Sequence, residues 1–168
     1  MSRALTISAS VGFLLAVMGF TPVFAQKADK YEKYLTTADS TQVTGFKGVE
    51  LSESTQSSST GHLYFSNKEG KQILKVKFYR ASLYKKDEAT KQGLVKGEVK
   101  GIGEDAYYGP NADMPYILSF KKGEFYVELS TIFNKDNVKD GKLQLFLTME
   151  QLKALGKTIA SRIENPKQ

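Results

Sequence analysis

The stretch GEVKGIGEDAYYGP, residues 97–110, decides between two fold classes. Its centre, residues 101–106, matches the pattern G-x-G-x-x-A of a dinucleotide-binding loop. Such a loop follows a strand and leads at once into a helix, whose N–H groups point at the pyrophosphate. Here Glu104 and Asp105 stand where phosphate would lie, and a Gly-Pro pair interrupts the chain before a helix can form. The glycines are therefore predicted to shape a backbone bend, and no nucleotide cofactor is expected.

The first 25 residues have the layout of a secretory signal peptide. Arg3 supplies a positive charge, an apolar run covers residues 7–24, and residues 23–25 (VFA) suit a signal peptidase. We expect cleavage between Ala25 and Gln26, with an uncleaved membrane anchor as the alternative. The apolar core is short for a span, which needs about 20 apolar residues. The mature chain is thus expected to be periplasmic or secreted, with no further transmembrane span.

The amino-acid composition excludes several kinds of chemical site. The 168 residues include no cysteine, which excludes disulfides, thiolate metal sites, a cysteine nucleophile and an acylated lipoprotein cysteine. Without the first 25 residues, 23 basic and 18 acidic side chains remain, a net charge of +5. A surplus of this kind favours weak attraction to anionic surfaces. Outside the cytoplasm such surfaces are envelope polymers or lipid headgroups, so no nucleic-acid partner is expected.

The first half of the mature chain is predicted to form one helix and one hairpin. Residues 26–35 are expected to be a polar spacer or a fraying helix, and residues 36–46 a short helix between a threonine and a glycine. The serine-rich residues 52–61 are expected to be a flexible loop. Residues 62–66 and 73–79 alternate apolar and polar side chains about a turn, which is typical of a hairpin with one face in water.

The second half is predicted to add a surface helix, a second hairpin, a polar loop, a further strand and a final helix. These elements are expected at residues 81–96, 116–133, 134–141, 143–147 and 148–165. The final helix has the clearest pattern, because Leu152, Leu155 and Ile159 fall on one helical stripe. Together the elements predict a single α+β domain over residues 36–168. A mostly antiparallel β-sheet in it packs against N-terminal and C-terminal helices.

Candidate catalytic and metal-binding residues do not form a recognisable set. His62 is the only histidine and lies beside a serine-rich run, but serines in a flexible loop lack the fixed geometry of a triad. Glu124 and Glu128 share a strand face about 13 Å apart, wider than the carboxylate pairs of glycosidases. The Asx-rich residues 136–140 do not match the spacing of an EF-hand loop. We therefore assign no catalytic residue, no metal ligand and no cofactor.

One predicted surface combines basic and aromatic side chains. The candidate binding residues, on one strand face and at a nearby turn, are Lys75, Lys77, Tyr79, Arg80, Lys121 and Lys122. Interleaved cations and rings can hold an anionic polymer. The alternative is a solvated sheet face whose lysines discourage pairing with other strands.

Four segments resemble a widespread family of small exported bacterial proteins, often lipoproteins and mostly of unknown function. They are TTADSTQVTGFKG (36–48), GIGEDAYYG (101–109), LSFKKGEFYVELS (118–130) and LKALGKTIASRI (152–163). The resemblance implies a helix, a curled antiparallel sheet and a packed C-terminal helix, with no assigned reaction. This chain differs from many of those relatives in lacking an acylated cysteine and internal cysteines.

These features favour an exported, non-catalytic accessory or binding domain of the bacterial cell envelope. Its expected partner is an envelope protein or an anionic envelope polymer. The alternative from another class is a small hydrolase whose Asp, Glu and Tyr residues come together across strands. The balance favours a protein that is not an enzyme.

Overall fold

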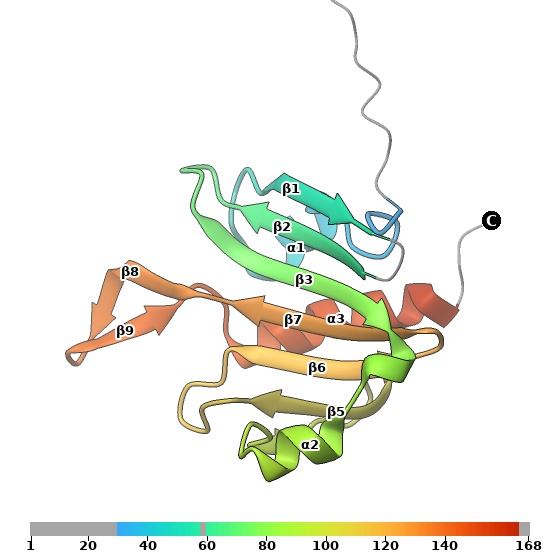
Figure 1. Cartoon of the computed structure of the whole chain (residues 1–168). Coiled ribbons are helices and arrows are strands. Elements are labelled where there is room, and N and C mark those ends of the chain that lie inside the picture. The colour runs from blue at the N-terminus through green and yellow to red at the C-terminus, as the bar shows by residue number, and fades with distance from the viewer. Residues whose placement is uncertain (1–29, 58–59, 165–168) are drawn as a thin grey trace, which may run out of the picture.

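A seven-stranded antiparallel sheet with helices on both sides forms the body of the protein, shown in a computed structural model (Figure 1). The structure describes residues 30–57 and 60–164, so the predicted signal peptide lies outside the described residues. The strands follow the spatial order β1-β2-β3-β7-β6-β5-β4, and β8 and β9 form a separate hairpin. Helices α1 and α3 cover one face of the sheet, and the short α2 lies at the other (Figure 1). The predicted α+β class is confirmed.

The elements have the following bounds. The strands are β1 (Glu50–Gln56), β2 (Thr60–Ser66), β3 (Gln72–Arg80), β4 (Gly97–Glu98), β5 (Glu104–Gly109), β6 (Ile117–Lys122), β7 (Phe125–Thr131), β8 (Phe133–Lys139) and β9 (Lys142–Leu145). The helices are α1 (Thr37–Thr44), the 3₁₀ turn η1 (Ala81–Leu83), α2 (Lys86–Lys91) and α3 (Met149–Glu164).

Strict alternation in the central strands creates the core. Along β3, Val76 and Phe78 are fully buried under the helices, whereas Lys75 and Lys77 point to the opposite face. β7 repeats the pattern in register with β3. Because side chains on a strand alternate between faces, each strand supplies both the core and the outer surface.

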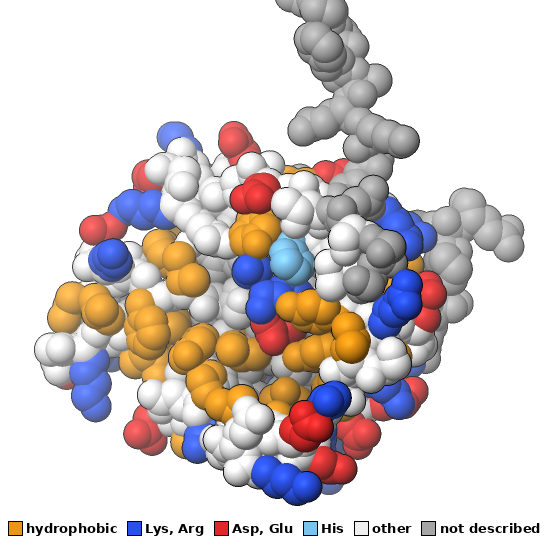
Figure 2. Space-filling view, in the orientation of Figure 1, with side chains coloured by type: hydrophobic (Ala, Val, Ile, Leu, Met, Phe, Trp, Pro, Cys, Tyr) orange, Lys and Arg blue, Asp and Glu red, His pale blue; other side chains and the backbone are white. Residues whose placement is uncertain are grey.

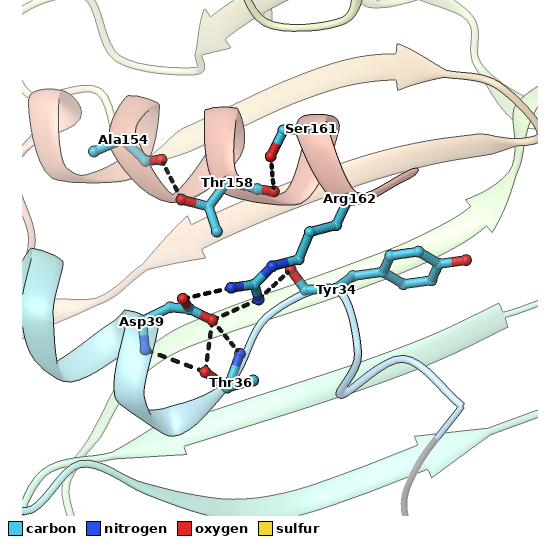
Figure 3. A network of polar contacts seen from close by, with 7 residues as sticks. All are labelled: Tyr34, Thr36, Asp39, Ala154, Thr158, Ser161 and Arg162. Atoms are coloured by element: carbon cyan, nitrogen blue, oxygen red, sulfur yellow. Dashed lines mark hydrogen bonds and ion pairs between the residues drawn. The ribbon is translucent and has the colours of Figure 1, made fainter. Parts of the chain in front are cut away.

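The final helix closes the core as its pattern predicts. Thr148 and Gln151 form the capping box, with each backbone N–H accepted by the other side chain at 2.9 and 3.3 Å. Leu152, Leu155 and Ile159 have no exposed surface. An ion pair between the two helices, described below, joins the C-terminal end of α3 to α1 (Figure 3).

A buried threonine connects the sheet to the segment that leads into α3. The hydroxyl of Thr131 donates to the carbonyl of Ile73 at 2.9 Å and accepts the backbone N–H of Leu147 at 3.1 Å. Since Leu147 is fully buried, this hydroxyl satisfies a backbone donor that water cannot reach.

Three predictions about local structure are wrong. Residues 30–35 are part of the core rather than a spacer, because Tyr31 stacks on Phe78 and Leu35 is fully buried. The serine-rich loop predicted at residues 52–61, of which 58 and 59 lie outside the described residues, is largely strand. β1 occupies the sheet edge, where backbone pairing with β2 suffices and polar side chains remain in water. The polar loop of residues 134–141 is mostly β8, which pairs with β9 outside the main sheet.

The glycine-rich bend is confirmed. Gly101 and Gly103 have φ of 77° and 55°, in the left-handed region that side chains disfavour. Glu104 begins β5, which runs antiparallel to β6, and not a helix with an open N-terminus. A Cβ at Gly103 would collide with the backbone carbonyl of Lys121, so the bend also lets β5 and β6 approach closely.

Candidate binding face

The face of the sheet opposite α1 and α3, here called the outer face, carries polar and aromatic side chains. Residues 81–96, including η1 and α2, cover its β5 and β6 side, so Ser119 and Tyr107 are buried there. The part formed by β2, β3 and β7 stays open. Figure 2 shows this side of the molecule, where apolar and tyrosine side chains gather across the middle beside His62.

Six rings form a continuous aromatic row across the outer face. Their order, from β2 to β5, is Tyr64, His62, Tyr79, Tyr126, Tyr84 and Tyr107. Successive ring centroids lie between 5.1 and 6.2 Å apart. At the centre, Tyr79 and Tyr126 stack at 5.2 Å with 26° between their planes. Such distances are those of interacting aromatic pairs, so the row is one packed surface rather than scattered rings.

The central lysine of the outer face is already paired. The Lys77 ammonium lies 2.5 Å from Glu128 Oε1, and both side chains are less than a quarter exposed. The Tyr126 hydroxyl donates to the other oxygen of Glu128 at 3.2 Å. Burial alone would lower the pKa of Lys77, but the hydrogen bond from its ammonium to Glu128 raises that pKa above its usual value.

His62 sits among these groups in its neutral form. Its Nε2 atom is buried and has no hydrogen-bond partner among the residues that the structure describes. Nδ1 lies 3.4 Å from the Tyr64 hydroxyl. Burial, and then the charges of Lys75 and Lys77, lower the pKa of His62. The ring therefore acts as an aromatic surface at neutral pH.

The structure brings three of the six predicted binding residues together. Lys75, Lys77 and Tyr79 share the outer face of β3, and the Lys75 ammonium lies 4.8 Å from the centre of the Tyr64 ring. Arg80 ends the same strand and is exposed.

Lys121 and Lys122 lie two strands away from that group, with Lys121 opposite Tyr126 of the aromatic row. Both belong to β6, and not to a turn as the sequence suggested. Lys121 forms an ion pair with Glu104 at 2.8 Å, next to the glycine bend. Its ammonium is thus paired with a carboxylate of the neighbouring strand β5 at the border of the aromatic row.

A pocket of about 280 Å³ opens where α2 faces the sheet. We call it the α2 pocket. Its wall is formed by residues from η1, α2, the segment after α2 and strands β5 to β7, among them Leu94, Tyr107, Ile117, Ser119, Tyr126 and Glu128. It adjoins the aromatic row, since Tyr107 and Tyr126 belong to both. Burial raises the pKa of Tyr126, so its hydroxyl stays protonated at neutral pH.

Sequence reasoning missed most of the row. Tyr126 and Glu128 could have been found, because they alternate with the buried Phe125 and Val127 on the strand after the predicted hairpin turn. Tyr84 and Tyr107 carry no such signal. They join the row only because residues 81–96 cross over β5 and β6, a contact between distant parts of the sequence.

Contacts on both carboxylate oxygens hold Glu128 in place. Its Oε1 pairs with the Lys77 ammonium, and its Oε2 accepts a hydrogen bond from the Tyr126 hydroxyl. This carboxylate therefore orders the outer face. Among residues 30–57 and 60–164, no three His, Asp or Glu side chains cluster closely enough to hold a metal ion.

Comparison with known proteins adds no function. No protein-family model, no curated protein and no solved structure matches this chain. In the part of the chain that the structure describes, no helix has the length and apolar character needed to cross a membrane.

Proposed function

We propose that the chain is an exported, non-catalytic binding domain of the bacterial envelope that holds an anionic glycan polymer on its outer face. One observation carries the proposal: the aromatic row, with Lys75 at one end and the α2 pocket at the other. Tyrosine rings offer flat, rigid surfaces with a polar tip. Sugar rings present C–H groups on their faces and hydroxyls at their edges, which complements such a surface.

Charge has a secondary role in this proposal. Lys77 is paired with Glu128, and Lys121 with Glu104. Lys75 remains above the Tyr64 ring, where its ammonium can contact an acidic group of a polymer that lies along the row. The net charge of +5 favours approach to an anionic surface. Binding should therefore weaken only modestly with salt, with a slope of about one counterion released.

Export rests on residues 1–25, which the structure does not describe. Expression of the full chain in a bacterium should yield a protein that begins at Gln26, as measured by intact mass. A retained leader, or a chain found only in the cytoplasm, would remove the envelope from the proposal.

Sedimentation with purified peptidoglycan sacculi, an insoluble anionic glycan, tests binding. Tyr79→Ala should weaken binding about tenfold, and Lys75→Gln about threefold, because the first removes the central ring and the second a single charge contact. Lys157→Gln, on the exposed side of α3, is the matched control and should bind like the wild type. Equal binding by all four proteins, each checked for folding by circular dichroism, would contradict the proposal.

A further inference from the structure

The α2 pocket differs in character from the open row beside it. Its volume of about 280 Å³ is just below the range of small-molecule sites, which is roughly 300–1,000 Å³. A cavity of this size has room for one ring rather than for an extended chain. Leu94, Ile117 and the ring of Tyr107 give it mainly apolar walls.

The charged groups of the wall are compensated. Glu128 is paired with Lys77, and Glu88 at the mouth is paired with Lys85 at 3.2 Å. A charged ligand would lose its hydration there without finding an unpaired counter-charge. The pocket is therefore matched to a neutral ligand.

One hydroxyl gives the pocket a polar contact point. The Tyr126 hydroxyl donates to Glu128 and can still accept one hydrogen bond. The Ser119 hydroxyl lies beside it, but its oxygen is buried and out of reach of a ligand in the pocket. A ligand hydroxyl can therefore donate to Tyr126.

We infer that the α2 pocket binds one neutral, hydroxyl-bearing ring of the size of a monosaccharide. This inference rests on the proposed function, because it makes the pocket the place where one uncharged sugar unit of the polymer is seated. The adjoining aromatic row contacts the units that follow.

The test is a titration of the full mature domain with single sugars, followed through backbone amide signals in NMR spectra. N-acetylglucosamine is the neutral probe, and glucuronate and glucosamine are charged probes of similar size. The neutral sugar should shift the amides of Tyr107, Ser119 and Tyr126 with a Kd on the order of 1 mM, as expected for so small a ligand. The charged sugars should bind at least about tenfold more weakly.

A filled pocket provides the matched variant. Ala89 lies on α2 at the pocket wall, so Ala89→Phe should abolish the shifts. Lys91→Phe places the same ring two residues further along the helix, outside the pocket, and should leave the shifts unchanged. Ala89 is on a surface helix rather than in the core, so the substitution leaves the fold intact, which the unchanged remainder of the spectrum will show.

The outcomes separate the inference from the proposed function. Absence of shifts at the pocket, shifts of equal strength with glucuronate, or tighter binding of phenol than of the sugar would overturn the inference. If sacculi still bind in a Tyr79-dependent manner in that case, the proposed function stands. Saturable sugar binding at the pocket without binding to sacculi would support the inference and remove the polymer from the proposed function.

Discussion

Arg162 and Asp39, 123 residues apart, form a bidentate ion pair between the last helix and the first (Figure 3). Nη1 and Nη2 of the arginine donate to the two carboxylate oxygens at 2.6 and 2.7 Å. The same carboxylate accepts the backbone N–H of Thr36 at 2.8 Å, which completes the capping box of α1. One acidic side chain thus caps α1 and joins it to α3.

Loss of this pair should destabilise the domain. Arg162→Met leaves a carboxylate that is only 18% exposed without its charged partner, so the free energy of unfolding should fall by about 1–3 kcal/mol. Chemical denaturation measures the change. Lys153→Met, which removes an exposed pair with Glu150 on the same helix, should cost less than about 0.5 kcal/mol. Equal losses in the two variants would refute a special role for Asp39.

The Asp39 carboxylate should also make the stability of the domain depend on pH in the acidic range. Burial works against its ionisation, but hydrogen bonds from Arg162 and Thr36 outweigh burial and lower the pKa of Asp39 from 3.8 to about 2. Since the folded pKa lies below the unfolded pKa, the stabilisation is complete above about pH 4 and is lost as the pH falls through 2. Denaturation at a series of pH values should show a loss of about 1–2 kcal/mol over this window. Asp39→Asn should lack that part of the slope, and an unchanged slope would count against the assignment.

The two glycines of the bend should respond differently to alanine. Gly103→Ala combines a positive φ with a collision against the carbonyl of Lys121, so we expect a loss of about 3 kcal/mol or more. Gly101→Ala meets no atom within 4 Å and should cost only about 1 kcal/mol of backbone strain. Thermal unfolding of the two variants checks the order. A larger loss of stability in Gly101→Ala would contradict the close approach of the Gly103 backbone to the carbonyl of Lys121.

The Thr131 hydroxyl offers a test that separates shape from hydrogen bonding. Thr131→Val keeps the volume but leaves the buried N–H of Leu147 without an acceptor, which should cost about 1–3 kcal/mol. Thr131→Ser keeps the hydroxyl and should cost less. Hydrogen exchange of the Leu147 amide provides a local measure, since its protection should fall only in the valine variant. Similar protection of the Leu147 amide in both variants would show that its hydrogen bond to Thr131 does not stabilise this segment.

The sequence predicts those parts of the fold in which local pattern and tertiary structure agree. The stripe of Leu152, Leu155 and Ile159 and the alternation of Phe125 with Tyr126 each report a buried face directly. The polar strands β1 and β8 give no such signal, because backbone pairing alone holds them at an edge or in an isolated hairpin. The burial of Tyr31 and Leu35 was missed because a few apolar residues at helical spacing in a polar segment do not show which part of the core they pack against.

For the candidate site, the sequence predicts only which residues of a single strand share a face. Lys75, Lys77 and Tyr79 follow from the alternation of β3. The pairing of Lys77 with Glu128 depends on the register of β3 against β7, which no local pattern specifies. The α2 pocket depends further on the path of residues 81–96 over the sheet. Sequence reasoning therefore overestimated the role of positive charge on the outer face and underestimated the number of aromatic rings that come together there.

The strand order places every strand before residue 81 on one side of the β3–β7 boundary and every other strand of the main sheet on the other. That boundary is a single ladder, from Leu74 opposite Thr131 to Arg80 opposite Phe125, and Tyr31 reaches across it to Phe125. The molecule is thus divided into two consecutive pieces that each contribute half of a shared interior. A backbone break within residues 86–93 would leave each piece with its own strands and one of the two helices that cover the core, α1 or α3. The separated fragments should therefore recombine into a noncovalent complex.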